Sequence, residues 1–232
     1  MAFVWKLATV IDKHPSRQPV ALDPSLSSVP LMNIEPTSYI WQRGLPELRG
    51  ARVTLRELRA GDGISLFTAA TNREVTRYIS PPPPTVEGFE QFITFAQRQR
   101  VAGQCASFAI VPRGSDVAIG LFHLRSLQPD FCSAEWGFLL ASEFWGSGVF
   151  TDSARLVMEF AFGVLQVHRL EARAALRNER ANAALRKLGA VREGVLRKSF
   201  LRHGELLDQA MWTILADEWR AAQQPRESQV IH

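Results

Sequence analysis

One segment near the middle of the chain joins an apolar strand, a glycine turn and the start of a helix. The run from Ala134 to Leu140 is apolar enough to form a buried strand. Gly146 and Gly148 follow it, and glycine permits a tight turn and a close approach of a ligand to the backbone. The next helix presents unpaired N–H groups and the positive end of its dipole, an arrangement that binds phosphate or pyrophosphate. The alternative is a strand-to-helix turn that binds no ligand.

The hydrophobic pattern around this segment predicts an α/β domain. Apolar runs predict strands over residues 52–58, 107–111, 117–125, 132–140, 170–176, 191–201 and 206–214. Helical spacing predicts helices over residues 62–70, 87–101, 151–165 and 178–188, with Asp62 and Asn178 as caps. The sequence Arg202-His203-Gly204-Glu205 is the predicted hairpin turn between the last two strands.

The first 45 residues differ from the rest of the chain in composition. Five prolines recur there among several serines and one asparagine, with little periodicity. We therefore expect an extended or partly ordered arm over residues 1–45, a domain over 46–220 and a short tail over 221–232. Trp5, Tyr39 and Trp41 are the arm residues that could bind to the domain.

Two motifs, in this order, resemble those of the GNAT N-acetyltransferases. The sequence Glu143-Phe144-Trp145-Gly146-Ser147-Gly148 resembles their acetyl-CoA pyrophosphate loop, and residues 178–190 resemble their second motif. The branch most similar in appearance is RimJ/RimL-like, which acetylates ribosomal-protein N-termini. The resemblance covers about residues 48–219. It implies a GNAT fold of the α/β (α+β) type, with a mixed, mostly antiparallel sheet of about seven strands, about four flanking helices, and a splay between the fourth and fifth strands.

The resemblance also implies which residues bind acetyl-CoA and its product CoA. Backbone groups of Phe138, Leu139 and Leu140 would bind the pantetheine amides, and a backbone N–H there would polarise the thioester carbonyl. The pyrophosphate would lie against Phe144, Trp145, Gly146, Ser147, Gly148, Val149 and Phe150. Asn178 and Asn182 would line the CoA side, and Arg186 would reach the adenosine phosphates. The alternatives are a simple helix cap for Asn178 and an exposed helix surface for Arg186.

Acetyl transfer needs a neutral amine, because an ammonium ion has no lone pair, so the site needs a proton acceptor. The resemblance makes Glu135 the candidate base. On an alternating strand Gly137 shares its face and leaves room beside the carboxylate. The alternative is a structural glutamate paired with an arginine of a neighbouring strand.

The general acid for the leaving thiolate is missing from its usual places. Many relatives have a serine at the position of Ala181 or a tyrosine further along that helix, but the only tyrosines here are Tyr39 and Tyr78. Water could protonate the thiolate, since a thiol is a tolerable leaving group. His203 is a further candidate, with an exposed turn histidine as the alternative.

The acceptor pocket of the family comes from the segments that correspond to residues 79–86 and 198–206. We expect Tyr78, Ser80 and His123 to contact the substrate. The acceptor would be a protein N-terminus, a polyamine-like metabolite or an amino sugar, acetylated by direct transfer in a ternary complex. Neither segment carries chemistry that identifies one of these.

The net charge of +4 is unevenly spread, because residues 169–203 hold ten Lys or Arg against three Glu. This segment could attract the phosphates of CoA, or nucleic acid and the ribosome, or simply form a solvated basic face. Two other functions therefore stay open: an inactive acyl-CoA-binding regulatory module, and an RNA- or ribosome-associated protein.

Length and composition restrict the class of protein further. A chain of 232 residues with 46% hydrophobic residues suits a globular domain with a core of its own. No apolar run reaches the 18 or so residues of a membrane span, and no signal peptide is recognisable, so we expect a cytoplasmic protein without a membrane partner. Cys105 and Cys132 are expected to be buried thiols, and no metal site is expected. We expect a monomer or a homodimer.

Overall fold

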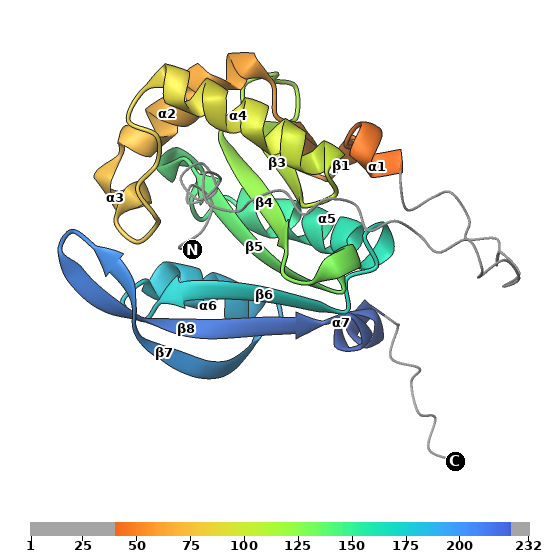
Figure 1. Ribbon diagram of the computed structural model, residues 1–232, viewed down its shortest axis with the longest axis vertical. Helices are drawn as coiled ribbons and strands as arrows, with labels where there is room; N and C mark the ends of the chain where they lie inside the picture. The colour runs from red at the N-terminus through yellow and green to blue at the C-terminus, as the bar shows by residue number, and fades with distance from the viewer. Residues whose placement is uncertain (1–39, 224–232) are drawn as a thin grey trace, which may run out of the picture.

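The computed structural model describes residues 40–223, which form one mixed sheet with helices on both faces (Figure 1). The eight strands of this part follow the order β1-β2-β3-β4-β5-β6-β8-β7. Their bounds are β1 Leu48–Arg49, β2 Val53–Glu57, β3 Cys105–Pro112, β4 Gly120–Ser126, β5 Ser133–Leu140, β6 Arg169–Ala175, β7 Val191–Arg202 and β8 Glu205–Leu215. The seven α-helices are α1 Ile40–Arg43, α2 Gly63–Thr71, α3 Arg73–Thr76, α4 Val86–Val101, α5 Val149–Gly163, α6 Glu179–Lys187 and α7 Ala216–Gln223.

The sheet is antiparallel except where β5 meets β6. That parallel pairing covers three residue pairs, from Ser133 with Arg169 to Glu135 with Glu171. β5 continues to Leu140 and β6 to Ala175, but beyond these three pairs the two strands no longer pair with each other. They diverge and leave a gap. The predicted splay is confirmed at the predicted pair of strands. The additional strand relative to the prediction is β1, only two residues long, and the additional helices α1, α3 and α7 are also short.

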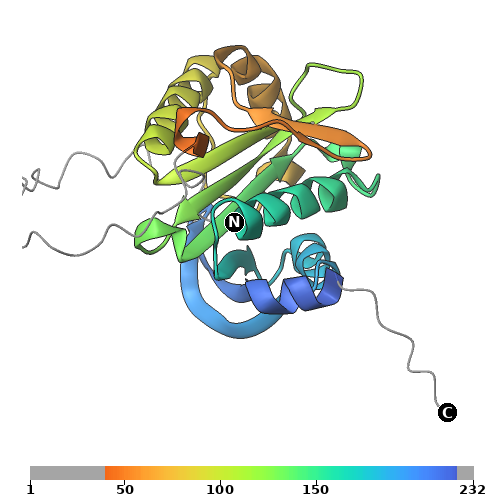
Figure 2. The same cartoon turned by 90° about the vertical axis from the view of Figure 1, so that its right-hand side faces the viewer.

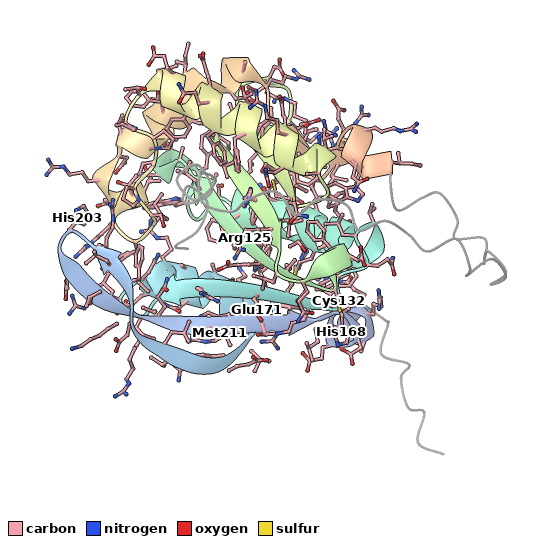
Figure 3. The ribbon with its side chains drawn as sticks, viewed as in Figure 1. Arg125, Cys132, His168, Glu171, His203 and Met211 are labelled. Carbon is pink, nitrogen blue, oxygen red and sulfur yellow. The ribbon has the colours of Figure 1, made fainter. Side chains whose placement is uncertain are left out.

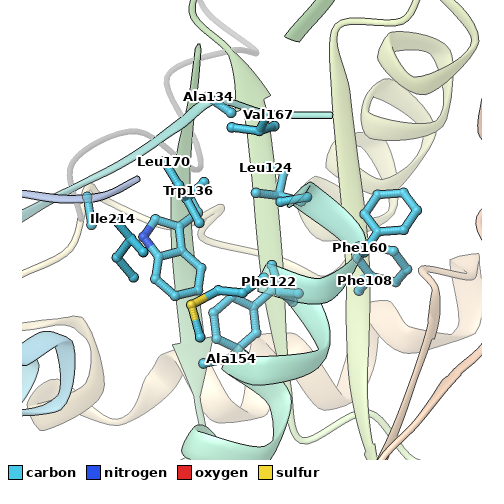
Figure 4. Packing of buried hydrophobic residues seen from close by; sticks show 14 of the residues in the cluster. Phe108, Phe122, Leu124, Ala134, Trp136, Ala154, Phe160, Val167, Leu170 and Ile214 are labelled. Atoms are coloured by element: carbon cyan, nitrogen blue, oxygen red, sulfur yellow. The ribbon is translucent and has the colours of Figure 1, made fainter. Parts of the chain in front are cut away.

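Helices pack on both faces of the sheet (Figure 2), and a hydrophobic core lies on each face. The larger core packs α5 against the central strands, with Phe108 edge-to-face on Phe160 at 5.0 Å between ring centroids (Figure 4). This follows from the sequence, because the apolar residues of α5 recur at helical spacing and face the sheet. The second core packs α2 and α4 over β3 and β4. Among residues 40–223, no helix is both long and apolar enough to cross a bilayer.

The hairpin between β7 and β8 has the predicted turn. Its central residues His203 and Gly204 both have positive φ, 50° and 78°, which is the pattern of a type I′ turn. The hairpin reaches back to α3 (Figure 1), where the Arg202 guanidinium donates a hydrogen bond to the Thr76 carbonyl at 2.9 Å. Tyr78 packs beside it on a small cluster that includes Phe200. The hairpin and α3 therefore close one end of the molecule together.

The packed residues begin before the predicted boundary at residue 46, because Trp41, one of the arm residues expected to bind to the domain, belongs to the main core. Its side chain is 6% exposed and meets Phe131 edge-to-face at 5.4 Å between centroids. The Arg100 guanidinium donates hydrogen bonds to the carbonyls of Trp41 and Gln42. The packed domain thus includes residues from about Ile40 onward. Trp5, Tyr39 and residues 224–232 lie outside the described residues.

Two smaller expectations are also corrected. Asp62 does not cap α2 with its side chain, because its carboxylate is held in a buried ion pair by both Nη atoms of Arg56, at 2.8 Å each. Cys132 is exposed, whereas Cys105 is buried as expected. Cys132 directly precedes β5, outside the core that the apolar neighbours suggested.

Candidate active site

The gap between β5 and β6 opens into a cavity of about 490 Å³. Its walls come from the C-terminal half of β5, the loop that follows and the first turn of α5, from α6 with the two residues before it, and from α3 with the residues after it. The lining includes Phe138, Leu139, Leu140, Trp145, Gly146, Gly148, Phe150, Asn178, Arg180 and Ala181. Four basic side chains, Arg77, Arg177, Arg180 and Lys187, face two acidic ones, Glu74 and Glu179. The cavity is therefore apolar near the sheet and basic at its rim.

The glycine turn places the N-terminus of α5 at this cavity and leaves two backbone N–H groups without a hydrogen bond within residues 40–223. Gly146 and Gly148 have φ of 75° and 84°, a conformation that side-chain-bearing residues rarely adopt. Their backbone N–H groups make no hydrogen bond to any other described residue. Together with the dipole of this 15-residue helix, they are groups of the kind that bind anions.

Asp152 in the first turn of α5 binds a distant turn rather than a ligand. Its carboxylate accepts hydrogen bonds from the backbone N–H groups of Ala51, Arg52 and Val53, at 3.3, 2.7 and 3.2 Å. The bound turn places the Arg52 side chain over Gly148, where its Nε lies 3.0 Å from the position a Cβ would take. The sequence analysis missed Arg52, because no local pattern links residues 100 positions apart.

Trp145 and Arg180 meet across the cavity. The indole Nε1 of Trp145 donates to the Leu140 carbonyl at 3.0 Å, which ties the ring to the end of β5. The Arg180 guanidinium, from the first turn of α6, lies 3.6 Å from the centroid of the same ring. This cation–π contact connects the two sides of the gap. Arg180 is a second basic residue that the sequence analysis missed.

The predicted CoA residues of α6 divide between cavity and core. Asn178 lines the cavity and also caps the helix, accepting a hydrogen bond from the Ala181 N–H at 3.1 Å. The Asn182 amide points inward, donating to the Ala175 carbonyl at 2.9 Å and accepting from the Trp212 indole at 2.9 Å. Asn182 and Arg186 do not line the cavity. Asn182 therefore joins α6 to the sheet.

The predicted loop residues divide in a similar way. Phe138, Leu139 and Leu140 line the cavity, and so do Trp145, Gly146, Gly148 and Phe150. Phe144, Ser147 and Val149 do not line it. Val149 is buried in the core, and the Ser147 hydroxyl donates to the Phe144 carbonyl at 2.6 Å.

Glu135 lies where the gap begins, at the last residue of β5 that pairs with β6. Its side chain is buried and both of its oxygens face arginines of neighbouring strands. Arg125 on β4 donates to one oxygen at 2.7 Å, and Arg173 on β6 lies 3.7 Å from the other. This geometry matches the alternative interpretation, a glutamate held in ion pairs.

Of the three predicted acceptor contacts, Tyr78 alone lines the cavity. Ser80 and His123 are both buried, each 3% exposed. The His123 Nδ1 shares a 2.7 Å hydrogen bond with the Ser107 hydroxyl. Burial, and secondarily the charge of Arg125, lowers the pKa of His123 to about 4, so the ring is neutral near pH 7. His203 lies in the exposed hairpin turn, and Ala181 lines the cavity without a hydroxyl group.

Comparison with known proteins agrees with this geometry. The family model of the acetyltransferase (GNAT) domain matches residues 52–191. An uncharacterized N-acetyltransferase of Bacillus licheniformis, p20, is 27% identical over 72% of this chain and 95% of its own length. The spermidine N(1)-acetyltransferase of Vibrio cholerae is 24% identical over 73% of this chain and 96% of its own.

A solved structure shows the same fold. The GCN5-related N-acetyltransferase of Brucella melitensis superposes with a TM-score of 0.66 at 24% identity, covering 76% of this chain and 81% of that one. The splayed sheet, the glycine turn and the family match all lead to one assignment. The chain belongs to the GNAT acetyltransferase family and is an acetyl-CoA-dependent N-acetyltransferase.

Proposed function

We propose that the chain transfers the acetyl group of acetyl-CoA directly to a primary amine, a small molecule or a protein N-terminus, in a ternary complex. The observation that carries this proposal is the cavity in the gap between β5 and β6, with an open helix N-terminus at its rim. Both ends of a thioester cofactor find suitable groups there: apolar strand residues for the pantetheine arm and basic groups with free N–H donors for the phosphates.

The residues that would hold the phosphates come from three parts of the chain. The N–H groups of Gly146 and Gly148 would donate hydrogen bonds to the anion from the turn. Arg52 approaches from the turn before β2, and Arg180 and Lys187 approach from α6. The loop from Ser142 to Gly148 itself contains no basic residue, so these side chains supply the positive charge.

The free edges of β5 and β6 would hold the pantetheine arm. Beyond Glu135, every second N–H and C=O of β5 points away from β4 into the gap. A bound acetyl-CoA supplies an activated thioester, and a backbone N–H of β5 would polarise its carbonyl. The Leu140 carbonyl is already occupied by the Trp145 indole, so the groups before it are the ones available.

The proton steps fall to water in this proposal. Glu135 could accept a proton only by giving up its ion pairs with Arg125 and Arg173. The acceptor amine would therefore pass its proton to water in the open cavity. Water would likewise protonate the departing thiolate, because Ala181 offers no hydroxyl.

The same two features favour the second candidate, a catalytically weak acyl-CoA-binding module. The experiment that separates them measures thiol release from acetyl-CoA with a panel of amines, including a polyamine, an amino sugar and peptide N-termini. Amine-dependent release with acetylated product supports the transferase. Acetyl-CoA binding by calorimetry, without amine-dependent release from any class, supports the module. A ribosomal-protein acceptor, as in the RimJ/RimL-like branch, would appear as preference for the peptide.

A further inference from the structure

We propose that the acceptor amine carries an anionic group and that Arg173 binds this group. The proposal rests on the acetyl transfer proposed above and narrows its substrate class. It follows from the position, the charge and the unused hydrogen-bond donors of one guanidinium.

Arg173 stands at the closed end of the gap. The last pair between β5 and β6 is Glu135 with Glu171, and Arg173 follows two residues later, on the same face of β6. This is the face on which α2 and α4 cover β3 and β4. In Figure 3 Glu171 and Met211 lie on its continuation over β6 and β8, where no helix of residues 40–223 covers the sheet. An acceptor that approaches the thioester from this face meets Arg173.

The carboxylate beside Arg173 lies deeper than the two guanidinium groups that it faces. One carboxylate, that of Glu135, faces two guanidinium groups, those of Arg125 and Arg173. The carboxylate is the buried partner: its side chain is 6% exposed, against 22% for Arg125 and 30% for Arg173. The cluster therefore presents guanidinium rather than carboxylate to the solvent.

The Arg173 guanidinium also has free donors. It donates no hydrogen bond to any residue between 40 and 223, and its Nε is buried without a partner. Arg169, four residues earlier on the same face of β6, is the contrast, because its guanidinium binds both Glu171 and Glu193. A planar guanidinium with unused donors matches the oxygens of a carboxylate or phosphate. A polycation would instead bring like charge to it.

The test compares matched amines with the full-length protein and acetyl-CoA by thiol release. The pairs are glycine against glycinamide, O-phosphoethanolamine against ethanolamine, and a peptide beginning with aspartate against the same peptide beginning with asparagine. Spermidine is the polycationic probe. We expect kcat/KM about tenfold or more higher for the anionic member of at least one pair, the effect of a charged hydrogen bond. The responding pair identifies the source of the anionic group.

Variants connect the preference to the residue. Arg173→Gln should remove the preference and leave the Kd of acetyl-CoA unchanged, while Arg173→Lys should retain part of it. Arg155→Gln is the matched control, since it removes the same charge from an exposed position on α5 and should preserve the ratio. This inference would be overturned if kcat/KM were equal for the anionic and neutral members of every pair, or if spermidine reached the kcat/KM of the anionic amines. Acetyl transfer itself would still stand. A preference that survives in Arg173→Gln would overturn the role of Arg173. Acetyl-CoA binding without release to any amine would overturn both proposals.

Discussion

The two interpretations of Glu135, ion-pair partner and general base, predict different effects of the substitution Glu135→Gln. Glu135→Gln keeps the shape of the side chain but removes the charge that Arg125 and Arg173 face. We expect the free energy of unfolding to fall by about 1–3 kcal/mol, less than for a fully buried pair because both arginines are partly exposed. Urea denaturation measures this loss.

The pH–rate profile of the same variant decides its catalytic role. In the ion-pair role, kcat/KM falls by a similar factor at every pH at which the variant is folded. A general base contributes about 10²–10⁴-fold, and its loss matters less at high pH, where more of the amine is already neutral. A deficit that shrinks as pH rises would therefore establish Glu135 as the base.

His123 should make the fold sensitive to mild acid. Its pKa is about 4 in the folded protein, because burial and the charge of Arg125 disfavour the imidazolium, and its ordinary value is 6.5. Between these values the unfolded chain binds a proton that the folded chain does not. Stability is therefore lost as pH falls from about 6.5 to about 4, by about 3 kcal/mol.

Urea denaturation across this pH range tests the effect. His123→Asn should flatten the pH dependence of the free energy of unfolding relative to the unmodified protein. The control is His168→Asn, which changes an exposed histidine and should leave the dependence as it was. If both variants follow the original curve, the buried ring is not its cause.

At the scale of the element, α5 has a glycine at each end, and replacing each glycine by alanine should have opposite effects. Gly148 precedes the helix with φ of 84°, and an added Cβ would meet Arg52. Gly163 ends it with open space around the Cβ position. Gly148→Ala should cost roughly 1–2 kcal/mol of stability through the strained backbone and weaken acetyl-CoA binding. Gly163→Ala should be neutral or slightly stabilising.

Calorimetry with acetyl-CoA and denaturation of both variants provide the comparison. A Gly148→Ala protein that binds acetyl-CoA with unchanged affinity would mean that the turn does not approach the cofactor. Loss of affinity in Gly163→Ala would show that the helix as a whole, rather than its first turn, controls binding.

At the scale of the whole molecule, the domain should tolerate removal of residues 1–39 but not of residues 1–44. A chain that begins at Ile40 keeps Trp41 in the core and should unfold in one cooperative transition. A chain that begins at Leu45 loses this side chain, and removing a buried tryptophan costs about 3–5 kcal/mol. Trp41→Ala in the full chain should reproduce most of that loss in urea denaturation. Equal stability of the two truncated chains would contradict the boundary drawn here.

The features that sequence predicts well are local ones. Asn178 caps α6 through a contact three residues away, and Gly204 permits a turn between adjacent strands, so both are visible in a short window. The partners of Glu135 lie on neighbouring strands, and the contact of Arg52 with Gly148 depends on the packing of α5 against the turn before β2. The start of the packed domain was hard to predict for a related reason: Trp41 follows a proline-rich stretch without periodicity, and only the folded core shows where it packs.

The short pairing between β5 and β6 changes the number of edges in this sheet. An open sheet has two edge strands, whose unpaired backbone groups are a hazard because other chains can add to them. Over the length of the gap this sheet has two more, one on β5 and one on β6. These inner edges face each other within one molecule, with the rest of the sheet on either side. A strand of another chain is therefore hindered from pairing with them. The fold thus leaves unpaired backbone N–H and C=O groups available to a thin ligand, while the surrounding sheet protects them from pairing with other chains.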